Sequence, residues 1–122
     1  MNDNYAGGVP DAFYRAVGVP DAKPLWVEYK FIKQLPKRDT TMIVPNLSEQ
    51  QLLWLKQARC SGEQAVVIIG CEGLKHNRNP VGVVLENQEE WELGISTSDF
   101  QLRAYANDYK TLAAYITKTC KG

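Results

Sequence analysis

The strongest constraint on this chain is one apolar segment, residues 25–32, which carries an acid and a lysine two positions apart. Its sequence is LWVEYKFI. Alternate residues of a β-strand face opposite sides, so Glu28 and Lys30 share one face. Charged side chains are costly on a mostly apolar strand unless they are paired or put to use. We therefore expect a strand that presents these two groups to a divalent metal and a phosphate.

A second acid, Asp11, comes earlier in the segment GVPD. Hydrolysis of a phosphodiester needs a nucleophilic water and a partner for the developing negative charge. A hard cation such as Mg²⁺, or Mn²⁺, meets both needs and prefers oxygen ligands. Asp11, Glu28 and the backbone carbonyl of Tyr29 are the expected ligands. Lys30 would orient the attacking water or stabilise the charged transition state.

These residues stand in the order of a known pattern: Gly8-Val9-Pro10-Asp11, then Glu28-Tyr29-Lys30, then Leu47-Ser48-Glu49-Gln50-Gln51. The arrangement resembles the signature of the PD-(D/E)XK nuclease superfamily. It is most similar to the VRR-NUC (virus-type replication-repair nuclease) branch in its small stand-alone, phage-like form. The resemblance covers roughly residues 7–70. It implies a restriction-endonuclease-like core and a fourth site residue, Gln51, beside Asp11, Glu28 and Lys30.

Two of these assignments have alternatives within the chain. The tetrapeptide GVPD occurs twice, so Asp21 competes with Asp11. Asp21 lies in a Pro-flanked turn, where it needs no further role, and we assign Asp11. The L-S-x-x-Q pattern selects Gln51 over Gln50, although a solvent-facing helix glutamine would look the same.

The chain departs from the superfamily at its beginning. Superfamily members usually have a helix before the PD strand that often adds a glutamate to the site, and only ten residues precede Asp11 here. The site would then work without that helix, or the C-terminal helices or a second subunit would supply the missing layer. By analogy with small VRR-NUC proteins, we expect a homodimer acting on branched DNA such as Holliday junctions.

Composition fits one globular domain over residues 1–122, with 71–122 a less certain C-terminal extension of it. Hydrophobic residues make up 44% and charged residues 23%, and no apolar run approaches the roughly 18 residues that span a membrane. The N-terminus has no signal-peptide pattern. Three cysteines without metal-site spacing suggest reduced thiols. We therefore expect a cytoplasmic location, in a bacterium or a phage-infected cell, and no membrane partner.

Net charge is zero, with 14 basic and 14 acidic residues, but the charges are unevenly placed. Residues 30–38 contain four basic side chains and no acid, whereas acids gather at 86–92. This asymmetry predicts a basic rim that binds DNA phosphates. The expected contacts are Lys33, Lys37 and Arg38, with Arg15, Tyr5 and Tyr14 as further candidates that could equally be core or surface residues. A solvated loop with ordinary lysines is the alternative.

The pattern of the whole chain predicts an α/β fold, with a mixed central sheet flanked by helices. We expect strands at 11–17, 25–32, 65–70 and 81–85, with a turn at 18–24 and a mobile flap over 33–46. A helix capped by Asn46 or Ser48 should run to about Cys60. Residues 91–95 favour a strand over a short helix. Helices are expected at 98–105 and at 108–119, the latter capped by Asn107.

The function that these expectations favour is a metal-dependent DNA endonuclease. The alternative is a non-catalytic nucleic-acid- or protein-binding module that retains the nuclease fold. In that case the strand with Glu28-Tyr29-Lys30 would no longer support catalysis. A purely structural strand is the simplest possibility. The one histidine, His76, lies in a polar loop, and we expect a phosphate contact or no role for it.

Overall fold

A four-stranded mixed sheet forms the centre of the protein in the computed structural model, which describes residues 7–74, 80–104 and 108–122. Its strands are β1 (Ala12–Tyr14), β2 (Leu25–Ile32), β4 (Gln64–Cys71) and β5 (Val81–Leu85), in the spatial order β1-β2-β4-β5. β2 and β4 run parallel, and the two outer strands are antiparallel to their neighbours. The predicted α/β fold with a mixed sheet is confirmed.

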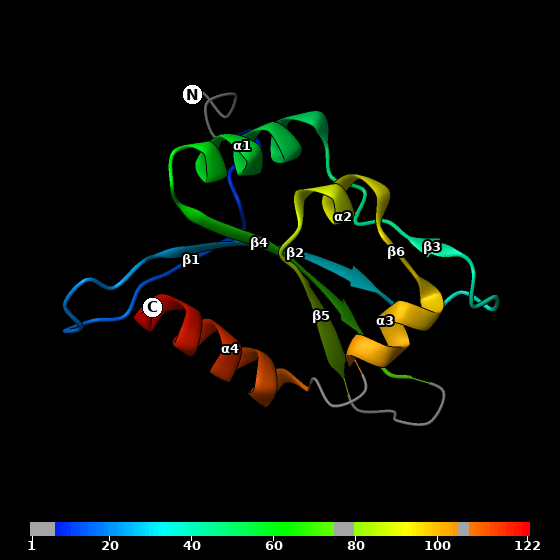
Figure 1. The fold of residues 1–122 in the computed structure, drawn as a ribbon. Coiled ribbons are helices and arrows are strands. Elements are labelled where there is room, and N and C mark those ends of the chain that lie inside the picture. Colours follow the sequence, from blue (N-terminus) through cyan, green and yellow to red (C-terminus); the bar gives the residue numbers. More distant parts are fainter. Residues whose placement is uncertain (1–6, 75–79, 105–107) are drawn as a thin grey trace.

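Helices cover both faces of this sheet (Figure 1). On one face lie α1 (Glu49–Cys60), α2 (Gln88–Leu93) and α3 (Thr97–Ala104), and on the other lies α4 (Tyr109–Lys121). Alternate residues of β4 enter the two hydrophobic clusters, which explains its unbroken apolar sequence. The first cluster contains Val67 and Ile69, the second Val66 and Ile68.

Helix α1 makes the crossover between the parallel strands, and its start is fixed by local hydrogen bonds. Ser48 is the N-cap, so the choice between Asn46 and Ser48 is resolved. The Ser48 hydroxyl accepts from the backbone N–H of Gln51 at 3.1 Å, and the Gln51 side chain accepts from the Ser48 N–H at 3.0 Å. This reciprocal capping box holds the Gln51 side chain in one place.

The prediction of a mobile flap over 33–46 is wrong for its second half. Residues Met42–Ile43 form β3, which pairs antiparallel with β6 (Ile95–Ser96) in a separate two-stranded sheet. Ile43 is buried, and the Thr97 hydroxyl donates to the carbonyl of Thr41 at 2.7 Å. Two-residue strands are too short to show a period in the sequence.

The preference for a strand over residues 91–95 is also wrong, because α2 occupies most of this segment. Asn87 caps α2 through a bond from the N–H of Glu89, and Gly94 ends it with φ of 75°. Trp91 is buried with its indole N–H donating to the carbonyl of Leu85 at 2.7 Å. The turn chemistry on both sides thus outweighs the β propensity of the tryptophan.

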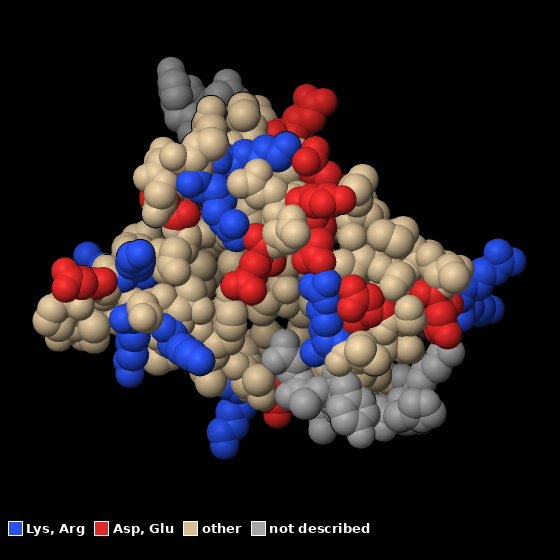
Figure 2. Space-filling model, viewed as in Figure 1, with Lys and Arg blue, Asp and Glu red and all other residues tan. Residues whose placement is uncertain are grey.

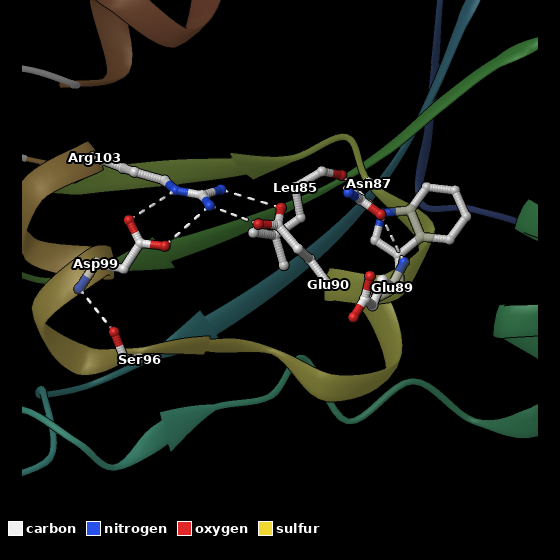
Figure 3. A network of polar contacts seen from close by, with 8 residues as sticks. Leu85, Asn87, Glu89, Glu90, Ser96, Asp99 and Arg103 are labelled. Atoms are coloured by element: carbon white, nitrogen blue, oxygen red, sulfur yellow. Dashed lines mark hydrogen bonds and ion pairs between the residues drawn. The ribbon is translucent and has the colours of Figure 1, made fainter.

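Arg103 joins α2 to α3 at the surface (Figure 3). Its guanidinium group contacts the carboxylates of Glu90 and of Asp99, one turn earlier in α3. The backbone N–H of Asp99 donates to the Ser96 hydroxyl. These contacts hold α3 in place relative to α2, so we assign Glu90 and Asp99 a structural role.

The two C-terminal helices are close to their predicted positions. α4 is capped by Asp108, whose carboxylate accepts from the N–H of Thr111 at 2.8 Å. The predicted cap, Asn107, is therefore wrong, because Asp108 holds the N-cap position. Asn107 itself lies outside the described residues, as do Tyr5, His76 and Tyr105. Among the helices of the described residues, none is long and apolar enough to cross a membrane.

Candidate functional site

Asp11 lies at the open edge of β2, directly before β1. β1 pairs with Leu25–Val27 of β2, and the register ends at Ala12 opposite Val27. Beyond that point the Asp11 carboxylate occupies this edge of β2, since its Oδ2 accepts a hydrogen bond from the backbone N–H of Tyr29 at 2.9 Å. The N–H and C=O of one strand residue face the same edge. The Tyr29 carbonyl therefore lies on the edge that Asp11 covers.

Gly8 explains why the first GVPD segment runs so close to α1. Its φ is +85°, and a Cβ built there would lie 2.3 Å from the carbonyl oxygen of Gln50. Only glycine permits both this conformation and this approach. In the second GVPD segment, Gly18 has open space around it, and Asp21 is exposed in the turn that joins β1 to β2. The structure thus brings Asp11, through its bond to Tyr29, to the strand that carries Glu28.

Glu28, Lys30 and Gln51 meet on the face of β2 that α1 covers. Glu28 is only 2% exposed, and its Oε2 accepts from the Gln51 side-chain amide at 3.1 Å. The Lys30 ammonium group donates to Gln51 Oε1 at 3.2 Å and lies 3.7 Å from Glu28 Oε2. Gln51 Oε1 also accepts the N–H of Ser48, which fixes the amide orientation. Gln50, by contrast, is exposed.

The pKa of Glu28 is raised to about 7, mainly by burial and then by the negative charge of neighbouring Asp11 and a side-chain hydrogen bond between the two. Lys30 opposes the rise. The two carboxylates therefore interact directly, as two like charges held close together do. Asp11, Glu28 and Lys30 together carry a net charge of −1 when both acids are ionised. This charge favours the binding of a cation.

The oxygen atoms at this site suit a hard divalent cation. Asp11 and Glu28 supply carboxylates, and the Tyr29 carbonyl supplies a third oxygen on the same edge. Within the described residues, no group of three or more histidine, cysteine or acidic side chains is placed so that it could hold a metal ion. Mg²⁺ binds through one or two carboxylates and retains several waters, so this small set fits Mg²⁺ better than Zn²⁺.

The raised pKa of Glu28 predicts a pH-dependent stability. Without metal, the folded state holds a proton on Glu28 between pH 4.5 and about 7, where the unfolded chain has lost it. Stability should therefore fall as pH rises from 5 to 8, by up to about 3 kcal/mol from this group. A Mg²⁺ ion held here would bind the ionised form, so added Mg²⁺ should restore stability most at pH 8.

Urea unfolding in chelator and then in Mg²⁺, at pH 5, 6, 7 and 8, measures both effects. Glu28→Gln is the control, because its side chain does not titrate and its difference from the wild type isolates the Glu28 contribution. Parallel curves for the two proteins across this range would show that Glu28 has an ordinary pKa.

The predicted DNA-contacting residues do not form one patch around the acids. Arg15 follows β1 and Lys33 follows β2, so each lies about 15 Å along the strand from Glu28, in opposite directions. Lys37 and Arg38 are exposed in the loop before β3. This loop is at the right of Figure 1, where Figure 2 shows basic side chains, while acidic ones spread around α2 and α3. The basic residues flank the site.

Aromatic side chains near the site were partly missed by the sequence reasoning. The hydroxyl groups of Tyr14 and Tyr29 are hydrogen-bonded at 2.6 Å. Tyr14 had been a candidate, but the Tyr29 side chain had not. Its position between Val27 and Phe31, on the strand face opposite Glu28, is the signal that could have found it.

Comparisons of the chain with protein-family models, with curated proteins and with solved structures found no match. The function is therefore inferred from the site residues and from their geometry.

Proposed function

We propose that the protein is a metal-dependent nuclease with a PD-(D/E)XK-type site that hydrolyses DNA phosphodiester bonds. The observation that carries the proposal is the convergence of Asp11, Glu28, Lys30 and Gln51 from three separate segments of the chain. A buried carboxylate beside a second one is costly to a fold. A metal site lined by oxygen atoms, with a net charge of −1, would account for this costly arrangement.

A bound Mg²⁺ or Mn²⁺ would neutralise charge on the scissile phosphate and lower the pKa of a water. Asp11, Glu28 and the Tyr29 carbonyl would hold it. Lys30 places a positive charge beside these acids, where it can stabilise the additional negative charge on the phosphate. Gln51 fixes the Lys30 ammonium group and the Glu28 carboxylate relative to each other through its two hydrogen bonds.

The resemblance to VRR-NUC proteins supports branched DNA as the substrate and a homodimer as the working form. We include both in the proposal, together with a cytoplasmic location. A restriction-endonuclease-like core is supported by the mixed sheet, with the site at the edge of its second strand. In a symmetric dimer, two such sites would cut two strands of a junction.

The test is cleavage of supercoiled plasmid and of a four-way junction by the wild-type protein. We expect cleavage with Mg²⁺ or Mn²⁺ and loss of cleavage when a chelator is added. The protein's size distribution, measured by sedimentation on the same sample, tests the dimer. Binding of these DNAs without metal-dependent cleavage would reject the nuclease and favour the non-catalytic binding module.

A further inference from the structure

A cavity lies between the sheet and α4, on the face of β2 opposite Glu28. Its volume is about 350 Å³, within the range of small-molecule sites. Its floor contains Ile68 and Gly70 of β4, and Leu112 and Ala113 of α4 contribute to its wall. A Cβ at Gly70 would lie 3.3 Å from a ring carbon of Phe31, so the absence of a side chain keeps this floor open.

Aromatic rings dominate the rest of the lining. Tyr14, Tyr29, Phe31 and Tyr109 contribute to the cavity, and the last three are also partly exposed, so the cavity opens to solvent. The hydroxyl pair of Tyr14 and Tyr29 supplies a polar edge. No acidic residue lines the cavity, within the part of the chain that the structure describes. Such a lining suits a flat, uncharged, partly polar ring system.

The cavity and the acidic site share β2. The Tyr29 N–H donates to Asp11 on the strand edge, while the Tyr29 side chain lines the cavity. Lys30 belongs to both, as a lining residue and as the partner of Gln51. Because adjacent strand residues project to opposite faces, the two sites lie on either side of the same strand. Along this edge, β1 pairs with β2 only as far as Val27 among the described residues.

We infer that this cavity, the tyrosine slot, holds an unpaired nucleobase of the same strand whose phosphate lies at Asp11 and Glu28. The inference deepens the proposed nuclease function and rests on it. A base stacked in the slot would fix the strand relative to the acids, and it would select DNA in which a base can leave the duplex, as at a junction or in a single strand. Stacking on aromatic rings accepts every base, so sequence preference should be weak.

The helix that walls the slot offers a matched pair of variants. Ala113 and Ala114 are both exposed, but only Ala113 lines the slot. Ala113→Leu places a larger side chain in the slot, and Ala114→Leu makes the same change outside it. Leucine is a good helix former, so neither variant should unfold α4. Tyr109→Ala and Tyr109→Phe form a second pair, in which only the first removes a ring.

The experiment uses the full chain in chelator, so that binding is measured without cleavage. The probes are a single-stranded oligonucleotide with 2-aminopurine at one position, moved along the strand, and the same sequence as a full duplex. In the wild type, we expect the fluorescence of the single strand to change on binding at a favoured position. Ala113→Leu and Tyr109→Ala should remove that change and weaken binding about tenfold. Ala114→Leu should stay within twofold of the wild type, and Tyr109→Phe, which keeps the ring, should retain the fluorescence change.

The outcomes separate this inference from the proposed function. Metal-dependent cleavage together with an unchanged signal in Ala113→Leu would overturn the slot and leave the nuclease intact. A signal lost in Ala113→Leu in a protein that never cleaves DNA would support the slot as a base-binding site and reject the nuclease. The slot would be overturned if the wild type gave no signal or responded equally to the duplex. It would also be overturned if Ala113→Leu changed only the oligomeric state.

Discussion

Lys30→Met should lower the rate of DNA cleavage by about 100- to 1,000-fold at saturating Mg²⁺, the usual effect of removing one preorganised charge from a transition state. Methionine has a similar length and no charge. Gln51 should keep its position, because the N–H of Ser48 still donates to its Oε1 after the ammonium group is gone. The loss should therefore reflect the missing charge and leave the fold unchanged.

The same substitution has a second effect that the pH profile separates. Lys30 lowers the pKa of Glu28, so its removal should move that pKa further above 7 and weaken metal binding at neutral pH. Raising the pH to 8.5 should recover metal affinity, measured by calorimetry, but should not recover the rate. If the rate recovered along with the affinity, Lys30 would act only through Glu28.

Lys33→Met is the matched control, since Lys33 is exposed just beyond the end of β2. A lysine that contacts only phosphate should weaken DNA binding and reduce its salt dependence, with little effect on the maximal rate. Undiminished cleavage by Lys30→Met, at any pH, would remove Lys30 from the mechanism and with it the central part of the nuclease assignment.

The sequence predicted the locally specified elements better than those that depend on distant contacts, for a physical reason. β2 and β5 have the bounds expected from their apolar runs, and Ser48 caps α1 as one of two predicted candidates. These signals are local. Gln51 was selected by pattern alone, and the structure adds the cause: the residue that completes the capping box is also the one whose amide reaches Glu28.

What could not be predicted depends on contacts between distant segments. β3 and β6 are strands because Ile43 and Ile95 pair across more than fifty residues of chain. The tyrosine slot forms only when α4 packs against β2 and β4. Gly8 is one of nine glycines, and nothing local marks it as the one that must approach Gln50. Such features need the assembled fold.

Asp11→Asn should reduce cleavage by about 1,000-fold and weaken Mg²⁺ binding, because a metal site supplies several kcal/mol of transition-state stabilisation. Asparagine keeps an oxygen that can accept the Tyr29 N–H, so the strand edge stays covered. It also removes the negative charge that helps to raise the pKa of Glu28. At pH 8 in chelator, the variant should therefore be at least as stable as the wild type.

The repeated tetrapeptide provides the control within the same chain. Asp21→Asn makes the identical change in the second GVPD segment, and asparagine tolerates the left-handed φ of 60° found there. Its cleavage rate and Mg²⁺ affinity should remain within twofold of the wild type. If Asp21→Asn abolished cleavage while Asp11→Asn left it unchanged, the metal acid would be in the turn. Since the structure instead directs Asp11 to the edge of the strand that carries Glu28 and Lys30, a loss confined to Asp11→Asn would tie metal binding and cleavage to that strand.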